Sequence, residues 1–533
     1  MKSVGVIFVA SLVVLGALTW LLLSSSAPPA PGVANPATGD TGSPVATSGE
    51  PITVFVAASN RGVFEAIRKD YEAAYHTPIE VQYGPSQTLL SSMEVSGTGD
   101  LYLPADDSYL DIAAQKGLIK ERLPLAVMKG VAVVPKGNPK KLQTLADLER
   151  DGIKLVQADP DAAAIGKVTR EALSADQKWE ALKARTTAFK TTVNDVANDV
   201  KIGSADVGII YDAVAASYPE LEIVRIPELD KVHGDVEVAV TASTKQPRRA
   251  LHLARYIAAA DKGLVKYKEF GFAPVEGDVW GESPEVLVYA GSMLRPAVEE
   301  TFKAFEEREG IKLTRVYNGC GILVAQMKTG ERPDAYFACD SEFMNEVQDL
   351  FQPRANVAQN ELVILVPKGN KHAIGSLKDL TKPGLKVGVG HEKQCAMGWL
   401  TQRTLVEGGV KDEVMSNVTV QTPTGDMLVN QLKAGSLDAA VAYISNAAGS
   451  SDTLDAIRIQ GLQCSIAVQP LAVSKGTKHP QLMGRLAERL KSAESKTQFL
   501  SFGFSWKGDE PVFGGVAPSE STPQDTTAKE EQK

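Results

Sequence analysis

Serine side chains follow short apolar stretches at two places in the first half of the chain, where each opens a predicted helix. Ser59 follows the apolar run of "ITVFVAASNRGVFEAI" (Ile52 to Ile67), and Ser86 stands in "YGPSQTL". The first turn of a helix leaves backbone N–H groups unpaired and carries a partial positive charge, so it holds an anion without a cationic side chain. A serine hydroxyl adds a further donor. The pattern indicates an anion site, and the alternative is that such a serine only caps its own helix.

All cysteines of the chain lie in its second half. The four cysteines are Cys320, Cys339, Cys395 and Cys464. In an exported protein cysteines usually pair as disulfides, but the spacing does not define the partners. A sharper alternative is a modified ligand site in which Cys320 and Cys395 face each other and bind a soft metal. Its further soft donors are Met293, His391 and Met397. A third alternative is that the thiols are buried as small hydrophobic groups.

Motifs for catalysis or cofactor binding are missing from the sequence. "HEKQC" carries Cys395 where a zinc-protease HExxH motif needs its second histidine, and no GxxxxGK[ST] phosphate loop is present. The carboxylate pair Asp106 and Asp107 is typical of a solvated helix start. A net charge of -9 argues against a nucleic-acid partner. We therefore predict a binding protein without enzymatic activity and without a cofactor.

Short apolar strands that alternate with amphipathic helices position these residues. The strand and helix pairs are "ITVFVAA" before a helix through Tyr75, "IEVQYG" before "SQTLLSSM", "GIKLVQAD" before "AIGKVTREAL", and "ADVGIIY" before "DAVAASY". Such alternation predicts an α/β fold with parallel sheets that helices cover on both faces. Ligands of such sheets bind beyond the carboxyl ends of the strands, which is where Ser59 and Ser86 fall.

The chain contains an internal repeat at an offset of about 232 residues. The clearest matches are "VPKGNPKKLQTLADL" from Val134 with "VPKGNKHAIGSLKDL" from Val366, and "GSADVGIIY" from Gly203 with "GSLDAAVAY" from Gly435. A unit of about 225 residues is too long for a solenoid repeat and has the size of a complete domain. We predict two tandem solute-binding domains over residues 51–280 and 284–507.

The two ends of the chain differ in composition from the repeated units. Val4 to Leu23 is an uncharged apolar run, and about 20 helical residues span roughly 30 Å of hydrocarbon. We predict a transmembrane signal anchor over residues 1–23, a flexible linker over 24–50 and a disordered polar tail over 508–533. The protein is then extracytoplasmic and anchored in the cytoplasmic membrane, or secreted if the first segment is cleaved.

The order and spacing of several segments resemble the molybdate-binding proteins of bacterial ABC transporters. The segments that carry the resemblance are "VFVAASN", "YGPSQTL", "DLYLPADDSYLD", "ADPDAAAIGKVTREAL" and "NDVANDVKIGSADVGIIYDA". It covers Ile52 to about Trp280 and, more loosely, Glu285 to Lys507. The resemblance implies two tandem bilobal periplasmic-binding-protein domains of type II, each with two mixed or parallel sheets flanked by helices around a cleft.

The family that this chain resembles binds a tetrahedral oxyanion through two serines, backbone N–H groups and a tyrosine hydroxyl, without a counter-charge. Carried over position by position, the implied donors of the first unit are Ser59, Ser86, the backbones of Ile165 and Val193, and Tyr211. Asn194 competes with Val193, because that stretch needs a one-residue insertion. The implied ligand is molybdate or tungstate, and the implied partner of this monomeric binding protein is an ABC permease.

The second unit departs from this pattern. Ser292 is retained, but the residue aligned with Ser86 is Gly319, so a hydroxyl is lost. The tentative ligand-contacting residues of this unit are Ser292, Gly319, Cys320, Cys395, Met397, Gly425 and Tyr443. We interpret the protein as a tethered solute-binding protein that captures an oxyanion. The alternative is a tethered sensor, or a protein that handles soft metals through its cysteine-modified second domain.

Overall fold

The computed structural model describes residues 50–507 of the chain. The predicted anchor (1–23), the predicted tail (508–533) and the predicted linker (24–50) up to its last residue lie outside the described residues. Within residues 50–507, no helix is both long enough and apolar enough to cross a membrane.

The first domain is built from alternating strands and helices. Its strands are β1 (Ile52–Ala57), β2 (Ile79–Gly84), β3 (Leu101–Leu103), β4 (Ile119–Pro135), β5 (Leu155–Ala158), β6 (Thr186–Lys190), β7 (Val207–Tyr211), β8 (Leu221–Val224), β9 (His233–Thr241) and β10 (Ala273–Pro274). Its helices are α2 (Arg61–Tyr75), α3 (Ser86–Ser96), α4 (Ser108–Gln115), α5 (Leu145–Leu148), α6 (Ala164–Ala175), α7 (Trp179–Arg185), α8 (Val193–Lys201), α9 (Asp212–Ala215), α10 (Pro247–Ile257) and α11 (Gly263–Glu269), with 3-10 turns η1 (Ala58–Asn60) and η2 (Pro227–Lys231).

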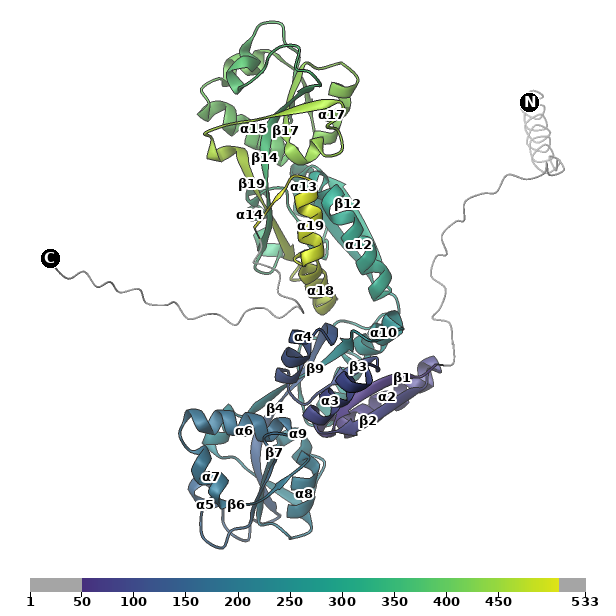
Figure 1. Cartoon of the computed structure of the whole chain (residues 1–533), viewed down its shortest axis with the longest axis vertical. Coiled ribbons are helices and arrows are strands. Elements are labelled where there is room, and N and C mark those ends of the chain that lie inside the picture. Colours follow the sequence, from purple (N-terminus) through teal and green to yellow (C-terminus); the bar gives the residue numbers. More distant parts are fainter. Residues whose placement is uncertain (1–49, 508–533) are drawn as a thin grey trace, which may run out of the picture. The chain divides into compact units, whose positions relative to one another are not determined.

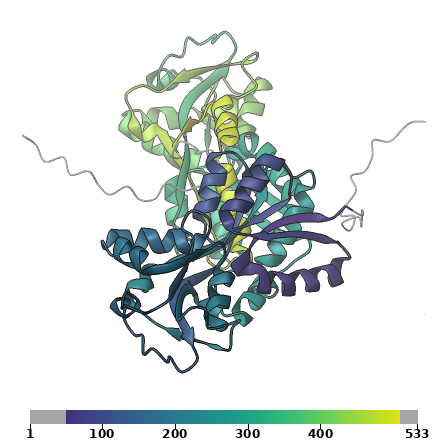
Figure 2. The same ribbon diagram turned by 60° about the horizontal axis from the view of Figure 1, so that its bottom comes forward.

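The strands of the first domain form two lobes that share the long strand β4. The strand order is β2-β1-β3-β9-β4-β7-β5-β6. The first part of β4, Ile119 to Lys129, pairs with β9, and Gly130 to Val133 pair with β7. The first lobe therefore contains β1, β2, β3 and β9, and the second contains β5 to β8. Figure 1 shows α2 and α3 on the first lobe and α6, α7 and α8 on the second, and the lobes stay separate in the turned view of Figure 2.

Apolar patterning explains why these segments form these elements. Strand β1 is parallel to both β2 and β3, and five of its six residues are buried, as expected for a strand covered on both faces. Helix α2 buries Val63, Phe64, Ile67 and Tyr71, which form one stripe at the helical period. The helix ends where His76 takes the left-handed conformation, with φ of 50°.

The second domain repeats this architecture. Its strands are β11 (Glu285–Gly291), β12 (Lys312–Asn318), β13 (Ala335–Phe337), β14 (Ala355–Pro367), β15 (Val387–Gly390), β16 (Val418–Thr422), β17 (Ala439–Tyr443), β18 (Leu454–Arg458), β19 (Ile466–Val473) and β20 (Ser505–Trp506). Its helices are α12 (Arg295–Glu309), α13 (Cys320–Lys328), α14 (Ser341–Asn345), α15 (Ala396–Glu407), α16 (Lys411–Ser416), α17 (Gly425–Lys433), α18 (Pro480–Leu490) and α19 (Ala493–Ser501), with 3-10 turns η3 (Ser292–Leu294), η4 (Gln348–Leu350), η5 (Leu377–Thr381), η6 (Ile444–Ala447) and η7 (Gln463–Ser465).

The strand order of the second domain is the order of the first. The sheet runs β12-β11-β13-β19-β14-β17-β15-β16, and β14 is shared between lobes as β4 is. Each domain has its own hydrophobic core, which extends from Ile52 to Phe272 in the first and from Val286 to Phe504 in the second. The predicted fold class, with two tandem bilobal α/β domains, is confirmed.

Candidate functional site

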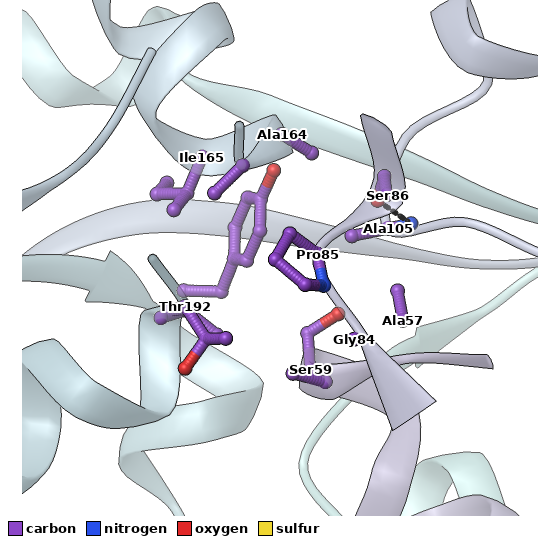
Figure 3. A pocket seen from close by; sticks show the side chains of 13 residues that line it. Ala57, Ser59, Gly84, Pro85, Ser86, Ala105, Ala164, Ile165 and Thr192 are labelled. Carbon is purple, nitrogen blue, oxygen red and sulfur yellow. Dashed lines mark hydrogen bonds between the residues drawn. The ribbon is translucent and has the colours of Figure 1, made fainter. Parts of the chain in front are cut away.

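A small hollow lies between the two lobes of the first domain (Figure 3). Its lining residues are Ala57, Ala58, Ser59, Gly84, Pro85, Ser86, Ala105, Ala163, Ala164, Ile165, Thr192, Val193 and Tyr211. The hollow measures about 260 Å³ with its open mouth included, which is below the range of pockets for drug-sized ligands. None of the thirteen lining residues carries a charge. The hollow therefore suits a small ligand that is bound by neutral groups.

Ser59 reaches this hollow from the carboxyl end of β1. It lies in the 3-10 turn η1, which connects β1 to α2. The alternative that Ser59 only caps its helix is wrong, because the N-cap of α2 is Asn60 and no side chain caps η1 or α2. The Ser59 Oγ atom is buried and has no hydrogen-bond partner. A buried hydroxyl gains free energy from any hydrogen-bond partner, so the Ser59 hydroxyl is available to a molecule that enters the hollow.

Ser86 is the first residue of α3 and lies on the same lobe as Ser59. Its Oγ accepts a hydrogen bond from the Ala105 backbone N–H at 3.1 Å, which Figure 3 shows. Tyr102 fixes the start of the helix, because its hydroxyl donates to the Ser86 carbonyl oxygen at 2.8 Å. Since a hydroxyl both accepts and donates, the Ser86 proton stays available for a ligand.

Two helices of the second lobe begin at the hollow. Helix α6 starts at Ala164 and α8 starts at Val193, and the first N–H groups of each lack a partner within the helix. Thr192 closes a capping box with Asp195, in which its hydroxyl accepts from the Asp195 N–H at 3.2 Å and donates to the carboxylate at 2.8 Å. Thr192 therefore orients the start of α8. The remaining backbone N–H groups of the first turn are free to donate into the hollow.

Tyr211 ends β7 and is completely buried. Its hydroxyl oxygen has no hydrogen-bond partner. Burial, and to a lesser degree the nearby Asp106, raises the pKa of Tyr211 well above its usual value, so the phenol remains a neutral donor. A β-carbon at Gly234 would lie 3.0 Å from the Tyr211 hydroxyl. Because Gly234 has no side chain, the Tyr211 phenol can occupy the space beside it.

All five residues predicted to bind in the first unit, namely Ser59, Ser86, Ile165, Val193 and Tyr211, line this one hollow. Asn194 does not line it, although its Oδ1 is buried without a partner. Sequence reasoning missed Ala105 and Thr192, and it missed the small residues that surround them. The sequence did contain a signal that Thr192 starts a helix at this point. Thr192 stands three residues before Asp195, which is the spacing of a capping box.

The prediction that Asp106 is a solvated helix start is wrong. Asp106 is only 5% exposed, and it accepts hydrogen bonds from the Ser108 hydroxyl and N–H. Lys167 from α6 donates to Ser108 at 2.7 Å, so this group bridges the two lobes. Burial raises the pKa of Asp106, and burial together with Asp106 raises the pKa of Asp107 to about 6. The carboxylates lie beside the hollow without lining it.

In the second domain, the structure corrects the alignment of Ser86 with Gly319. Helix α3 begins at Ser86 after the N-cap Pro85, and α13 begins at Cys320 after the N-cap Gly319. Cys320 Sγ accepts from the Cys339 N–H at 3.0 Å, as Ser86 Oγ does from Ala105. The counterpart of Ser86 is therefore Cys320, because the offset between the units is 234 residues here and falls to 232 only further along the chain.

The structure also defines the cysteine partners that the sequence left open. Cys320 forms a disulfide with Cys339, while Cys395 and Cys464 are free. Cys320 thus does not face Cys395 as a free thiol in this state. Among residues 50–507, no group of three or more His, Cys, Asp or Glu side chains is arranged to hold a metal ion.

The other tentative residues of the second domain lie at the equivalent element ends. Cys395 is the N-cap of α15, Met397 is in its first turn, Gly425 begins α17 and Tyr443 ends β17. Ser292 opens η3. The Tyr443 hydroxyl is buried without a partner, as the Tyr211 hydroxyl is. The second cleft thus keeps the tyrosine and the helix starts, but Met293 and Cys320 stand in the places of Ser59 and Ser86.

A comparison with protein families agrees with the duplicated architecture. Residues 52–273 and residues 286–505 each match the family described as "Bacterial extracellular solute-binding protein". The chain belongs to this family. It contains two tandem copies of the solute-binding domain.

Relatives of this solute-binding protein correspond to one domain each. The molybdate-binding protein ModA of Mycobacterium bovis is 30% identical over 212 residues, which is 39% of this chain and 79% of ModA. The putative binding protein of Haemophilus influenzae is 24% identical over 226 residues, or 42% of this chain and 91% of that protein. The putative ABC transporter substrate-binding lipoprotein YvgL of Bacillus subtilis is 25% identical over 225 residues, which is 41% of this chain and 86% of that protein.

Solved structures of similar proteins include two oxyanion-binding proteins. The periplasmic molybdate-binding protein of Azotobacter vinelandii is 15% identical with a TM-score of 0.38, and the match covers 42% of this chain and 100% of that one. The sulfate-binding protein SubI of Mycobacterium tuberculosis is 14% identical with a TM-score of 0.37. The match covers 42% of this chain and 86% of SubI.

Proposed function

We propose that the first domain binds a small tetrahedral oxyanion of the molybdate or tungstate type, which the protein captures for an ABC importer. The observation that carries this proposal is a pair of buried hydroxyls without partners, Ser59 and Tyr211, in a hollow with no charged lining residue. Three helices, α3, α6 and α8, begin at the same hollow. The N–H groups at helix starts and the hydroxyls can all donate hydrogen bonds into the hollow. A ligand that mainly accepts hydrogen bonds matches them, and an oxyanion is such a ligand.

Neutral donors suffice for useful affinity. A hydrogen bond to a charged group contributes about 1.5 to 3 kcal/mol, whereas a micromolar complex requires about 8 kcal/mol. The hydroxyls of Ser59, Ser86 and Tyr211, with the backbone N–H groups of Ile165 and Val193, provide five donors. Their sum is about 7.5 to 15 kcal/mol, so donors near the upper end of the range exceed that requirement. The name of ModA, a 30% identical relative, is consistent with this ligand class.

We also propose the setting in which the protein works. An anchor over residues 1–23 would hold a monomer on the outer side of the cytoplasmic membrane, with residues 24–50 as a tether. The loaded first domain would then dock on a permease. Cell fractionation tests the anchor: we expect the full chain in the membrane fraction and a chain lacking residues 1–23 outside it.

Isothermal titration calorimetry of the full chain tests the ligand class. We expect molybdate and tungstate to bind in the micromolar range or tighter, and sulfate and phosphate to bind more weakly. Ser86→Ala removes one donor to a charged ligand, so the affinity for molybdate should fall roughly 10- to 150-fold.

The matched control lies in the second domain. Ser292→Ala removes a serine hydroxyl from the start of η3 in the second domain and should leave the molybdate affinity of the first domain unchanged. Circular dichroism verifies that both variants are folded. Unchanged affinity in Ser86→Ala, or an equal loss in Ser292→Ala, contradicts the proposed site.

A further inference from the structure

A series of three polar side chains connects the two lobes of the first domain beside the hollow. The Lys167 Nζ atom of α6 donates to the Ser108 hydroxyl of α4 at 2.7 Å, and Ser108 donates in turn to the buried Asp106 carboxylate. A lysine ammonium only donates and a carboxylate only accepts, which fixes the direction of the hydroxyl between them. The series therefore runs from a cation on the second lobe to an anion on the first.

The first lobe provides a second contact for the Lys167 ammonium. The Nζ atom lies over the ring of the buried Tyr109, 5.0 Å from the ring centroid, where the electron density of the ring attracts a cation. The Ser108 N–H also donates to the Asp106 carboxylate at 3.1 Å, which fixes the start of α4. The lysine head group is thus received by side chains that the first lobe already holds in place.

Both ends of this series are adjacent to residues that line the hollow. Asp106 follows Ala105, and Lys167 lies two residues after Ile165. Figure 3 shows Ala105 and Ile165 on opposite sides of the hollow. The contact from Lys167 to the first lobe therefore fixes the distance between the donors that the two lobes direct at one ligand.

The two domains share a backbone contact between their lobes. In the first domain the Gln87 N–H donates to the Ala162 carbonyl oxygen at 3.4 Å, and in the second the Gly321 N–H donates to the Gln394 carbonyl oxygen at 3.1 Å. These places are equivalent, because each donor is the second residue of α3 or α13 and each acceptor lies two residues before α6 or α15. The approach of the lobes is therefore common to both domains.

The charged contact differs between the domains. Trp399 is the fourth residue of α15, as Lys167 is of α6, and its ring lies 5.0 Å from the guanidinium of Arg403 on the same helix. Glu342 stands in the place of Ser108, because the N–H of each donates to the aspartate two residues earlier. The lysine series thus accompanies the proposed oxyanion site and is replaced in the altered cleft.

We propose that Lys167, Ser108 and Asp106 form a latch that holds the lobes of the first domain closed around the oxyanion, with Lys167 as the positioning residue. None of the three lines the hollow, so the latch acts on the ligand through the position of the lobes. This inference rests on the proposed oxyanion function and adds the group that controls how long the anion is retained.

The latch raises the affinity by favouring the closed state. An oxyanion contacts the donors of both lobes only when the lobes are closed, so its apparent affinity follows the closed fraction. A contact that exists only in the closed state raises that fraction and slows opening. Loss of the latch should therefore speed release of the anion. The preference for molybdate over sulfate depends on the lining residues and should stay the same.

Calorimetry of a double-mutant cycle in the full chain tests the latch. Lys167→Met removes the donor, and Ser108→Ala removes the hydroxyl but keeps the lysine charge. Each should weaken molybdate binding by roughly 3- to 10-fold, because the contact is charged but only half-buried. The double variant should bind no more weakly than the weaker single variant, since both changes break the same contact. The ratio of molybdate to sulfate affinity should equal that of the wild type in all three.

Two further variants are matched to this cycle. Ser108→Thr restores a hydroxyl and should rescue the affinity that Ser108→Ala loses. Lys183→Met removes a positive charge from an exposed position of α7 on the same lobe and should leave the affinity unchanged. Normal binding by Ser108→Ala, additive losses in the cycle, or an equal loss in Lys183→Met would show that the lysine acts by its charge alone and overturns the latch.

Hydrogen exchange of the ligand-free chain separates failure of the latch from failure of the proposed function. Lys167→Met and Ser108→Ala should both increase exchange at the starts of α4 and α6, where the lobes meet, and Lys183→Met should not. Increased exchange in a chain that binds no oxyanion supports the latch and contradicts the proposed function. Unchanged exchange in both latch variants overturns the latch, whatever the wild-type chain binds. Circular dichroism verifies that each variant is folded.

Discussion

Buried aspartates occupy the same position beside both clefts. Asp106 follows Ala105 in the first domain, and Asp340 follows Cys339 in the second. Their exposures are 5% and 7%. Burial raises the pKa of each above its usual value, and that of Asp340 reaches about 6. The fold therefore favours the protonated acid at both places.

Replacement of Asp340 by asparagine should stabilise the protein at neutral pH. Because the folded-state pKa lies above the unfolded value of 3.8, the stability from this acid is complete below about pH 4 and is lost as pH rises through about 6. Asparagine stays neutral and still caps α14, where Asp340 accepts from the Glu342 N–H at 2.9 Å. We expect Asp340→Asn to gain about 1 to 3 kcal/mol at pH 7.5 and almost nothing at pH 4.

Urea unfolding of the full chain at a series of pH values measures this difference. Asp349→Asn is the matched control, since Asp349 is an exposed aspartate of η4 in the same lobe. That variant should differ little from the wild type at any pH. A gain from Asp340→Asn that is equally large at pH 4 and pH 7.5 would show that ionisation is not the cause.

At the scale of elements, the start of α8 is fixed by its own capping box. Thr192 and Asp195 exchange hydrogen bonds there, and Val193 in the next position lines the hollow. The first domain contains a second box of the same kind at α5, between Thr144 and Asp147. The two boxes are chemically alike, but only the first lies at the candidate site.

Thr192→Ala should therefore affect both stability and oxyanion binding. Loss of a threonine cap typically costs about 0.5 to 2 kcal/mol of folding stability, and the freed first turn of α8 would no longer hold its N–H groups toward the ligand. We expect Thr192→Ala and Thr144→Ala to destabilise the protein by similar amounts. Only Thr192→Ala should weaken molybdate binding, by several-fold in calorimetry. Equal affinities in the two variants would exclude α8 from the site.

The elements themselves were predictable from the sequence because their signals are local. The strand and helix order of β1, α2, β2 and α3 follows from apolar runs and helical stripes that extend over fewer than about 20 residues. The equivalence of Ser86 with Cys320 was not predictable, because the offset between the units is 234 residues from β1 to α3 but 232 residues at the clearest sequence matches further along the chain. The structure establishes this equivalence in two ways. Each residue begins a helix, and each side chain accepts a hydrogen bond from the backbone N–H of the residue 19 positions later.

Long-range contacts explain the remaining differences between sequence and structure. The burial of Asp106 depends on Lys167 and Ser108, which meet across the two lobes. The pairing of Cys320 with Cys339 depends on the packing of β13 beside β11, which no local pattern reports. The position of the hollow was predictable only from the residues that follow the carboxyl ends of the strands. Such ends lie together at one edge of a sheet, where ligands bind.

At the scale of the whole molecule, a duplicated domain has kept its fold while the chemistry of one cleft has changed. Both domains retain a strand-end tyrosine whose hydroxyl is buried without a partner, at Tyr211 and Tyr443. Both serines are different, since Met293 is the counterpart of Ser59 and Cys320, the counterpart of Ser86, is held in a disulfide. A disulfide sulfur donates no hydrogen bond, so the second cleft lacks a donor that the first has.

The oxidised full chain should therefore bind one oxyanion and not two. The missing donor at Cys320 costs roughly 1.5 to 3 kcal/mol, and the sulfur of Cys339 stands where Ala105 leaves space in the first domain. Calorimetry with molybdate should give a stoichiometry of one per chain, and Ser86→Ala should weaken that single event. Replacing Met293→Ser, Cys320→Ser, Cys339→Ala, Cys395→Ala and Met397→Ile together introduces the residues of the first cleft at five positions. This variant should show a second, weaker binding event, and a wild-type stoichiometry of two would refute the assigned loss of function.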